Sequence, residues 1–198
     1  MPPFTVLHVC MGNICRSPMA ERLLAHAIRQ RARHDDVIYS HSAGTGGWHV
    51  GDGMNPPAAR QVCARGGDDS GFAARRLRSE HIDSADLVLT ATCEQQDYVV
   101  ALRPDAAGRT FVLGEFGRLL AAVDPAALPP TGADADTVYA RATAIVEAAD
   151  VARAGAPPLP GDDLDDPWGR GDKAFKRVAD EIEDTVRPFA ALLLPAGQ

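Results

Sequence analysis

The stretch that decides the fold reads Val9-Cys10-Met11-Gly12-Asn13-Ile14-Cys15-Arg16-Ser17-Pro18. An apolar run from Phe4 to Val9 leads into it and predicts a buried strand. Apolar residues at helical spacing begin at Pro18 and continue to Ile28, which predicts a helix. Cys10 is therefore expected at the end of a strand, in a loop that opens directly into a helix.

The loop between this strand and this helix has the properties of an anion site. Its backbone amides lack helical partners, and the helix dipole adds positive potential at the same place. Gly12 and Asn13 tolerate the positive φ angles of a tight loop, and Arg16 can bind two phosphate oxygens together. The positive potential of the amides and of Arg16 favours the thiolate form of Cys10, and Ser17 can donate a hydrogen bond to its sulfur. Cys10 alone would be typical of a small buried apolar residue, but its neighbours favour a nucleophile.

Composition narrows the class of protein. The 198 residues predict a single domain, 1–198, and the formal net charge of -7 argues against a nucleic-acid partner. No apolar run is long enough for a membrane span, and the start Met1-Pro2-Pro3-Phe4 lacks the features of a signal peptide. The cysteines lack metal-site spacing, so we predict no metal and no other cofactor. We expect a monomer in the reducing cytoplasm. The cysteine positions are Cys10, Cys15, Cys63 and Cys93.

Strand and helix patterns alternate along the chain. Further strands are predicted at 36–40, 85–90 and 109–113, and further helices at 56–65, 94–102, 137–153 and 171–194. This alternation predicts an α/β fold with three layers, a four-stranded parallel sheet with helices on both faces. The carboxyl ends of its strands, after Val9, Ser42 and Thr90, should form the binding edge.

Three segments modify this pattern. Residues 42–48 are expected to form a flexible, Gly-rich loop. Residues 121–160 are rich in Ala, Pro, Asp and Gly, and we interpret them as an insertion packed on the domain and partly mobile. Pro188 is expected to bend or interrupt the last helix.

The stretch from Cys10 to Pro18 resembles the signature loop of the low-molecular-weight protein tyrosine phosphatases, and the composition suggests a bacterial, actinobacterial-type member. The resemblance implies that Cys10 attacks phosphorus to form a cysteinyl-phosphate, while Arg16 and the loop amides stabilise the phosphoryl oxygens. It also implies a polar network of Asn13, Ser17 and Ser42 that holds the loop in its strained shape. The loop residues predicted to bind substrate are Met11, Gly12, Asn13, Ile14, Cys15 and Ser17.

A second stretch, Asp162-Asp163-Leu164-Asp165-Asp166-Pro167-Trp168-Gly169, has the composition of a solvated acidic loop. Asp166-Pro167-Trp168, however, resembles the general-acid loop of the same phosphatases. Asp166 would protonate the leaving phenolate and then deprotonate the attacking water, with Asp165 as the rival candidate. Trp48 and Trp168 could form the walls of a slot for an aromatic ring.

The chain also departs from the family pattern. Phe72 stands where relatives often have a histidine that supports the polar network, and Ala91-Thr92 stands where they often have Met-Asp. The resemblance covers residues 4–113 and 162–194 well and residues 121–160 poorly. These departures put loop rigidity and the level of activity in question.

Phosphotyrosine in proteins is the substrate that the resemblance implies, and a bacterial tyrosine kinase is a candidate partner. A phosphoarginine phosphatase of the same fold is an alternative, although Ile14 stands where such enzymes carry Thr. A non-catalytic phosphate-binding module is a second alternative. An arsenate reductase would need two further cysteines close together, whereas Cys63 and Cys93 are far apart in sequence. Cys15 could form a disulfide with Cys10 after oxidation, or could simply be a packing residue.

Overall fold

A parallel β-sheet forms the centre of the computed structural model, which describes residues 2–32, 37–132 and 134–195. Its strands are β1 (Phe4–Cys10), β2 (Ile38–Gly44), β3 (Leu87–Thr90) and β4 (Thr110–Val112), and they lie in the order β2-β1-β3-β4. All the pairings are parallel, and Cys10 at the end of β1 is in register with Gly44 at the end of β2. This places the loop after Cys10 at the carboxyl edge of the sheet, as predicted.

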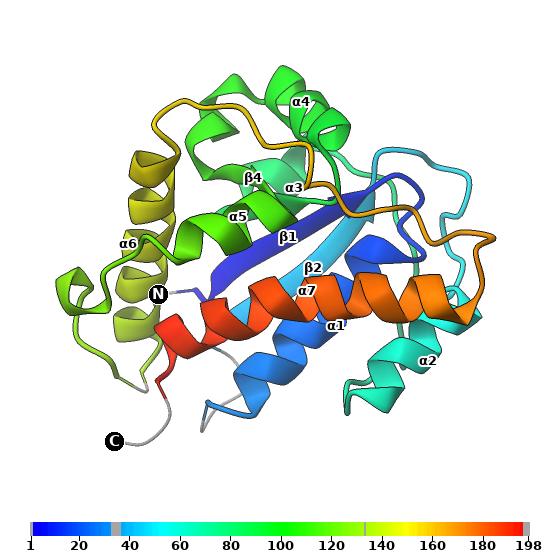
Figure 1. The fold of residues 1–198 in the computed structure, drawn as a ribbon, viewed down its shortest axis with the longest axis horizontal. Coiled ribbons are helices and arrows are strands. Elements are labelled where there is room, and N and C mark those ends of the chain that lie inside the picture. The colour runs from blue at the N-terminus through cyan, green and yellow to red at the C-terminus, as the bar shows by residue number, and fades with distance from the viewer. Residues whose placement is uncertain (1, 33–36, 133, 196–198) are drawn as a thin grey trace.

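Helices cover both faces of the sheet (Figure 1). One core contains residues of α1 (Arg16–Arg29), α2 (Pro56–Ala64), α5 (Leu113–Leu120), α6 (Ala135–Arg153) and α7 (Asp172–Leu193). The opposite core contains residues of α3 (Ser79–Asp83) and α4 (Cys93–Leu102). Short 3-10 helices occupy Pro104–Arg109 (η1) and Pro125–Ala127 (η2). The predicted three-layer α/β class is confirmed.

Alternation along β1 divides the two cores. Phe4 and Val6 belong to the larger core, whereas Leu7 and Val9 belong to the smaller one, because successive side chains on a strand point to opposite faces. Both cores contact β1, so burial on both sides fixes the strand that ends at Cys10. The nucleophile candidate therefore lies at the end of a strand that is packed on both faces.

Several element boundaries differ from those predicted. β2 continues to Gly44, so residues 42–44 belong to a strand and not to the Gly-rich loop, while residue 36 lies outside the described residues. Helix α7 runs through Pro188 without interruption. The sequence patterns did not predict α3 or α5. In α5, Gly114 and Gly117 obscure the helical pattern, yet a Cβ on Gly117 would lie 2.3 Å from Thr185 Oγ1, so glycine is what allows α5 to approach α7.

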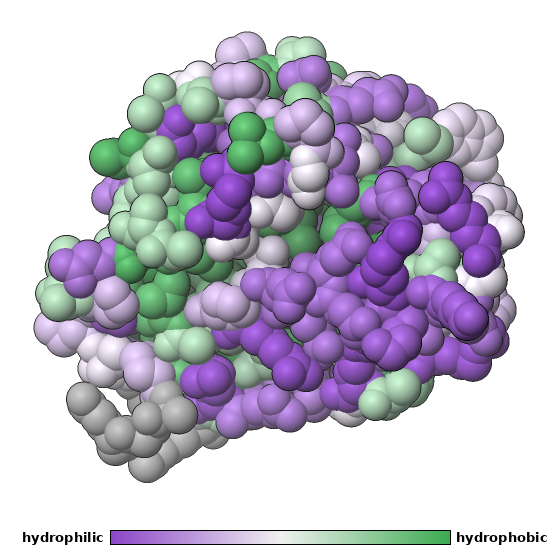
Figure 2. Space-filling view, viewed as in Figure 1, coloured by the Kyte–Doolittle hydropathy of each residue, from purple (hydrophilic) through white to green (hydrophobic). Residues whose placement is uncertain are grey.

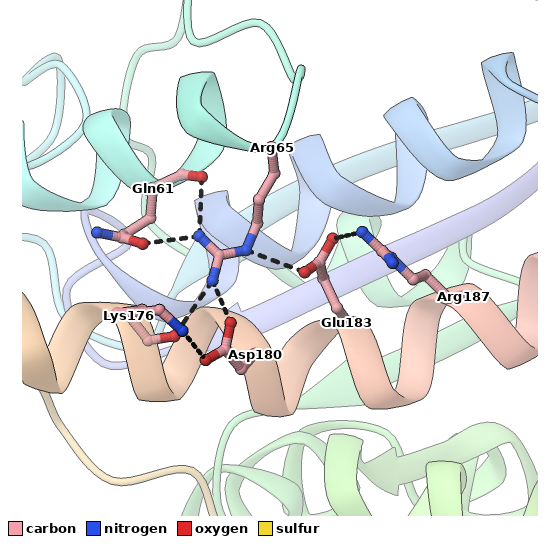
Figure 3. A network of polar contacts seen from close by, with 6 residues as sticks. All are labelled: Gln61, Arg65, Lys176, Asp180, Glu183 and Arg187. Carbon is pink, nitrogen blue, oxygen red and sulfur yellow. Dashed lines mark hydrogen bonds and ion pairs between the residues drawn. The ribbon is translucent and has the colours of Figure 1, made fainter.

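A polar network joins α2 to α7 beside the core (Figure 3). Arg65 at the end of α2 donates from Nε to Glu183 at 3.0 Å and from Nη1 to Gln61 Oε1 at 2.7 Å, and it also pairs with Asp180. Arg187 extends the network from the far side of Glu183. The remaining surface of α7 is strongly hydrophilic, whereas apolar residues gather where α5, α6 and the end of α7 meet (Figure 2).

The segment 121–160 is tied to the domain mainly through α6. Arg141 is buried and donates to the Leu192 carbonyl at 2.6 Å, and the Arg153 guanidinium lies 4.3 Å from the centroid of the Phe111 ring. The interpretation of this segment as a family-atypical, partly mobile insertion stays a prediction. Within the described ranges, no helix combines the length and apolar character needed to cross a bilayer.

Candidate active site

The end of β1 and the start of α1 hold Cys10 in a ring of donors. Cys10 is only 2% exposed, and its Sγ lies 2.9 Å from Ser17 Oγ. The backbone amide of Asn13 donates to the same sulfur at 3.3 Å. Hydrogen bonds of this kind stabilise a thiolate, because they place positive hydrogens around the sulfur.

Asn13 organises the loop from behind. Its φ of 56° lies in the left-handed region, which asparagine tolerates better than most residues. Its Nδ2 donates to Ser17 Oγ at 2.9 Å and to Ser42 Oγ at 2.8 Å, while its Oδ1 accepts from the Arg75 amide at 2.9 Å. Ser42 in turn donates to Glu21 Oε2 at 2.6 Å. Both polar atoms of the Asn13 side chain are therefore engaged in supporting the loop.

Phe72 takes no part in this network. It packs at the edge of the larger core, where the Arg22 guanidinium lies 5.8 Å from the centroid of its ring. Because Asn13 is already paired with Ser17, Ser42 and Arg75, the aromatic residue leaves no polar atom of Asn13 without a partner. The loop thus remains supported although the histidine expected from the resemblance is missing.

The residues that directly follow β2 also hold the loop through their backbone. The amides of Thr45 and Gly46 donate to the carbonyls of Cys10 and Met11, each at 2.9 Å. A Cβ on Gly44 would lie 2.7 Å from the Met11 carbonyl oxygen, so only glycine permits this close approach. Gly44 was predicted merely as a loop residue, and its contact with the phosphate loop could be found only from the strand register.

Arg16 and Asp166 meet at the pocket although they are far apart in sequence. Arg16 is 5% exposed, and its guanidinium donates to the Leu164 carbonyl at 3.2 Å and lies 3.2 Å from Asp166 Oδ2. Asp165 turns elsewhere, to Arg177 on α7 at 2.5 Å. Of the two predicted candidates for the general acid, Asp166 is therefore the one placed at the site.

The cavity above Cys10 has a volume of about 190 Å³. Trp48 and Trp168 both lie on its wall and are 75% and 54% exposed, so their rings are available to a ligand. Asn13 and Ser17, which were predicted to bind substrate, do not line this cavity, because their side chains point into the network behind the loop. The cavity is lined by Cys10, Met11, Gly12, Ile14, Cys15, Arg16, Trp48, His49, Asp166 and Trp168.

His49 is a lining residue that the sequence patterns did not reveal. Its Nδ1 lies 2.9 Å from Asp52 Oδ2, and its ring centroid is 5.9 Å from that of Trp168. A Cβ on Gly12 would lie 3.2 Å from His49 Cδ2, so the imidazole rests directly on the phosphate loop. No motif marks this histidine, and its position next to Trp48 was the only available signal.

Burial separates the roles of the two cysteines in the loop. Burial raises the pKa of Cys15 to about 12, and the negative charges of Cys10 and Asp166 act in the same direction. Cys15 is therefore a neutral thiol at physiological pH and does not compete as a nucleophile. Burial also raises the pKa of Glu21, although the hydrogen bond from Ser42 and the nearby arginines partly offset this effect.

Ala91 and Thr92 have structural roles of their own. The Ala91 amide donates to the Val9 carbonyl, and the Ala91 carbonyl accepts from the Leu164 amide, each at 2.8 Å. The Thr92 hydroxyl caps α4 by accepting from the Gln95 amide at 3.4 Å. Ala91 therefore connects β1 to the loop that carries Asp166, and Thr92 fixes the start of α4, despite the departure from the family pattern.

The sequence model described as "Low molecular weight phosphotyrosine protein phosphatase" matches residues 5–149. The chain belongs to this family. The match includes the whole loop from Cys10 to Pro18 and ends before Asp166, whose placement here depends on the geometry described above.

Curated relatives of this family member include proteins from actinobacteria. Low molecular weight protein-tyrosine phosphatase A of Mycobacterium tuberculosis is 45% identical over 44% of this chain and 52% of the relative, so the chain spans about half the relative's length. The Streptomyces coelicolor low molecular weight protein-tyrosine-phosphatase is 37% identical over 62% of this chain and 71% of its own. The Ptp protein of Acinetobacter johnsonii is 38% identical over 56% and 72%.

Solved structures share the fold of this phosphatase family member at low sequence identity. The YwlE arginine phosphatase from Geobacillus stearothermophilus superposes with a TM-score of 0.65 at 24% identity, covering 95% of this chain and 91% of that one. The tyrosine phosphatase Wzb from Escherichia coli K30 gives a TM-score of 0.63 at 22% identity, covering 96% and 97%. At these identities the comparison establishes the architecture alone.

Proposed function

We propose that this chain is a protein-tyrosine phosphatase that works through a cysteinyl-phosphate intermediate. The observation that carries the proposal is the convergence of three groups on one small cavity. The Cys10 sulfur lies at its base with two hydrogen-bond donors, and Arg16 and Asp166 lie on its wall. A nucleophile, an anion-binding cation and an acid are the parts that phosphoryl transfer requires.

In the first step, the Cys10 thiolate attacks phosphorus and the bond to the phenolic oxygen breaks. Asp166 gives its proton to the departing phenolate, which leaves as a neutral phenol. The loop amides and Arg16 stabilise the equatorial oxygens, where charge spreads in the transition state. In the second step, the oxygen of a water molecule attacks phosphorus while Asp166 takes a proton from that water. The sulfur–phosphorus bond breaks, and inorganic phosphate forms. The Ser17 hydroxyl, 2.9 Å from the sulfur, stabilises the departing thiolate.

Aromatic and apolar walls support phosphotyrosine as the substrate class. Trp48, Trp168 and His49 present rings at the mouth of the cavity, and Ile14 adds an apolar side chain. A phenyl ring gains contact with such walls without requiring a hydrogen-bond acceptor. A guanidinium would leave several donors facing Ile14, which has no polar atom to accept from them, so phosphoarginine is the poorer fit.

Competing substrates and one inactive variant provide the test. Wild-type enzyme is expected to release phosphate from a phosphotyrosine peptide faster than from the matched phosphoarginine peptide, and Cys10→Ser is expected to release none from either. Faster turnover of phosphoarginine would favour the alternative enzyme. Phosphate binding without hydrolysis of either peptide would instead favour a binding module, and an active Cys10→Ser would refute the mechanism.

The setting of the enzyme is part of the same proposal. A thiolate nucleophile needs a reducing compartment, and all the cysteines in this structure are free thiols, which supports a cytoplasmic location. Phosphotyrosine proteins, a bacterial tyrosine kinase among them, are the proposed partners, and the enzyme is proposed to act as a monomer.

A further inference from the structure

An ion pair with a buried carboxylate lies at the start of the loop that carries Asp166. Asp162 is 6% exposed and receives two hydrogen bonds from Arg118 on α5, from Nη2 to Oδ2 at 2.7 Å and from Nε to Oδ1 at 3.2 Å. The Leu159 amide also donates to Asp162 Oδ2, at 2.6 Å. Bidentate pairing of this kind fixes both the position and the orientation of a carboxylate.

The backbone at Asp162 is packed equally closely. A Cβ on Gly114 in α5 would lie 2.5 Å from the Asp162 carbonyl oxygen, so the start of the loop rests directly on the helix. Burial alone would raise the pKa of the Asp162 carboxyl, but the hydrogen bonds from Arg118 and the Leu159 amide outweigh it and hold the pKa below its usual range. The carboxyl is therefore ionised and paired at physiological pH.

Contacts continue from this pair to the acid. Asp163 Oδ1 accepts from the Cys93 amide at 2.8 Å, and the Leu164 amide donates to the Ala91 carbonyl at 2.8 Å. The Leu164 carbonyl accepts from Arg16 at 3.2 Å. These contacts anchor three consecutive residues ahead of Asp166, whose own side chain is about half exposed and depends on this loop for its position.

We propose that Asp162 and Arg118 are positioning residues for the general acid. Together they fix the loop on α5, so that the Asp166 carboxyl stays beside Arg16 at the mouth of the cavity. The inference rests on the proposed function, since it assigns the pair to the proton-transfer step of that reaction. Neither residue contacts the cavity, so substrate and phosphate binding should depend little on them.

Leaving-group dependence separates this role from a general structural one. A phenolate of high pKa needs the proton from Asp166, whereas a strongly activated aryl leaving group departs without it. Because Asp166 also serves in hydrolysis of the cysteinyl-phosphate, which is common to both esters, the comparison uses kcat/KM, which reports only the steps up to departure of the leaving group. Asp162→Asn is expected to lower kcat/KM about tenfold on a phosphotyrosine peptide and less than about twofold on an activated aryl phosphate. Arg118→Gln is expected to show the same division, and its partly exposed side chain makes it the variant that decides if Asp162→Asn does not fold.

Asp83→Asn is the matched control. Asp83 forms a similar bidentate pair with Arg103, at 2.6 and 3.1 Å, but on α3, away from the cavity. This variant is expected to retain the wild-type kcat/KM on both esters. An Asp162→Asn variant that behaves like Asp83→Asn, or that loses kcat/KM equally on both esters, would overturn the positioning role.

The double variant Asp162→Asn/Asp166→Asn completes the test. If Asp162 acts only through Asp166, the double variant should fall within about twofold of Asp166→Asn alone, because the two effects share one step. If the losses of activity in the two single variants multiply in the double variant, the inference is overturned. Failure of the proposed function would give a different result. Either Cys10→Ser would hydrolyse the esters, or Asp166→Asn would lose as much activity on activated esters as on the phosphotyrosine peptide.

Discussion

Acidification is expected to destabilise this protein through two buried histidines. His8 on β1 is 1% exposed and His41 on β2 is 5% exposed. Burial, with a contribution from the charge of His41, lowers the pKa of His8 to about 3. Burial and the charges of Arg75 and His81 lower the pKa of His41 to about 4. Both imidazoles are therefore neutral in the folded protein, and His41 Nδ1 accepts a hydrogen bond from Arg75 at 2.6 Å.

The sign and size of the effect follow from linkage. In the unfolded chain each histidine titrates near its ordinary pKa of about 6.5, so the unfolded state binds more protons below that value. The free energy of unfolding is highest above about pH 6.5 and falls progressively as the pH drops from there to the folded pKa values of about 4 and 3, where the loss is complete. At about pH 5, protonation of each histidine in the unfolded chain lowers the protein's free energy of unfolding by roughly 2 kcal/mol, which makes roughly 4 kcal/mol for both.

Urea unfolding, followed by circular dichroism at about pH 7 and about pH 5, provides the measurement. Glu21 and Glu115 have pKa values raised by burial and act in the opposite direction, so variants are compared with wild type at each pH. His8→Gln should lose less stability on acidification than wild type, by roughly 2 kcal/mol, whereas His26→Gln on α1 controls for loss of an imidazole. An equal acid loss in wild type and His8→Gln would refute the reasoning.

Three further outcomes are expected from single substitutions. Asn13→Ala leaves the Arg75 amide and two serines without their partner, and kcat should fall roughly tenfold or more in steady-state assays while the protein remains folded by circular dichroism. Gly44→Ala places a methyl group 2.7 Å from the Met11 carbonyl, and thermal denaturation should show a loss of about 1–3 kcal/mol, with weaker inhibition by inorganic phosphate. Arg65→Ala removes the link between α2 and α7 and should lower the free energy of unfolding by about 1 kcal/mol, with a smaller difference in high salt; an unchanged midpoint in low-salt urea titrations would contradict this.

Local sequence patterns were sufficient to predict the structure of the loop from Cys10 to Pro18. A strand run, glycine and asparagine in the turn, and apolar helical spacing placed Cys10 and Arg16 correctly, because each signal arises within a few residues of the site. The same holds for the order of the four strands along the chain, whereas helices α3 and α5 were not predicted. Asp166 was found by a short motif, but its meeting with Arg16 depends on contacts between segments far apart in the chain.

Residues that act through tertiary contacts were missed for the same physical reason. Arg75, His49 and Asp162 carry no local signature, and each acquires its role only where β2, the loop beyond it or α5 comes close. Helix α5 was hidden because its glycines predict a break, although Gly117 allows close packing against α7 and Gly114 allows the backbone at Asp162 to approach. Local propensity and tertiary packing conflict at such positions, and packing determines the structure.

The pairing of Arg16 with Asp166 connects the free structure to the proposed reaction. A chain with a formal net charge of -7 does not attract a dianion at long range, so binding depends on the local field of the loop. Arg16 is buried and already faces a carboxylate at 3.2 Å, so an incoming phosphoryl group replaces one anion with another on the same guanidinium. The loop anchored at Asp162 meanwhile keeps the Asp166 carboxyl at the mouth of the cavity, within reach of the leaving oxygen.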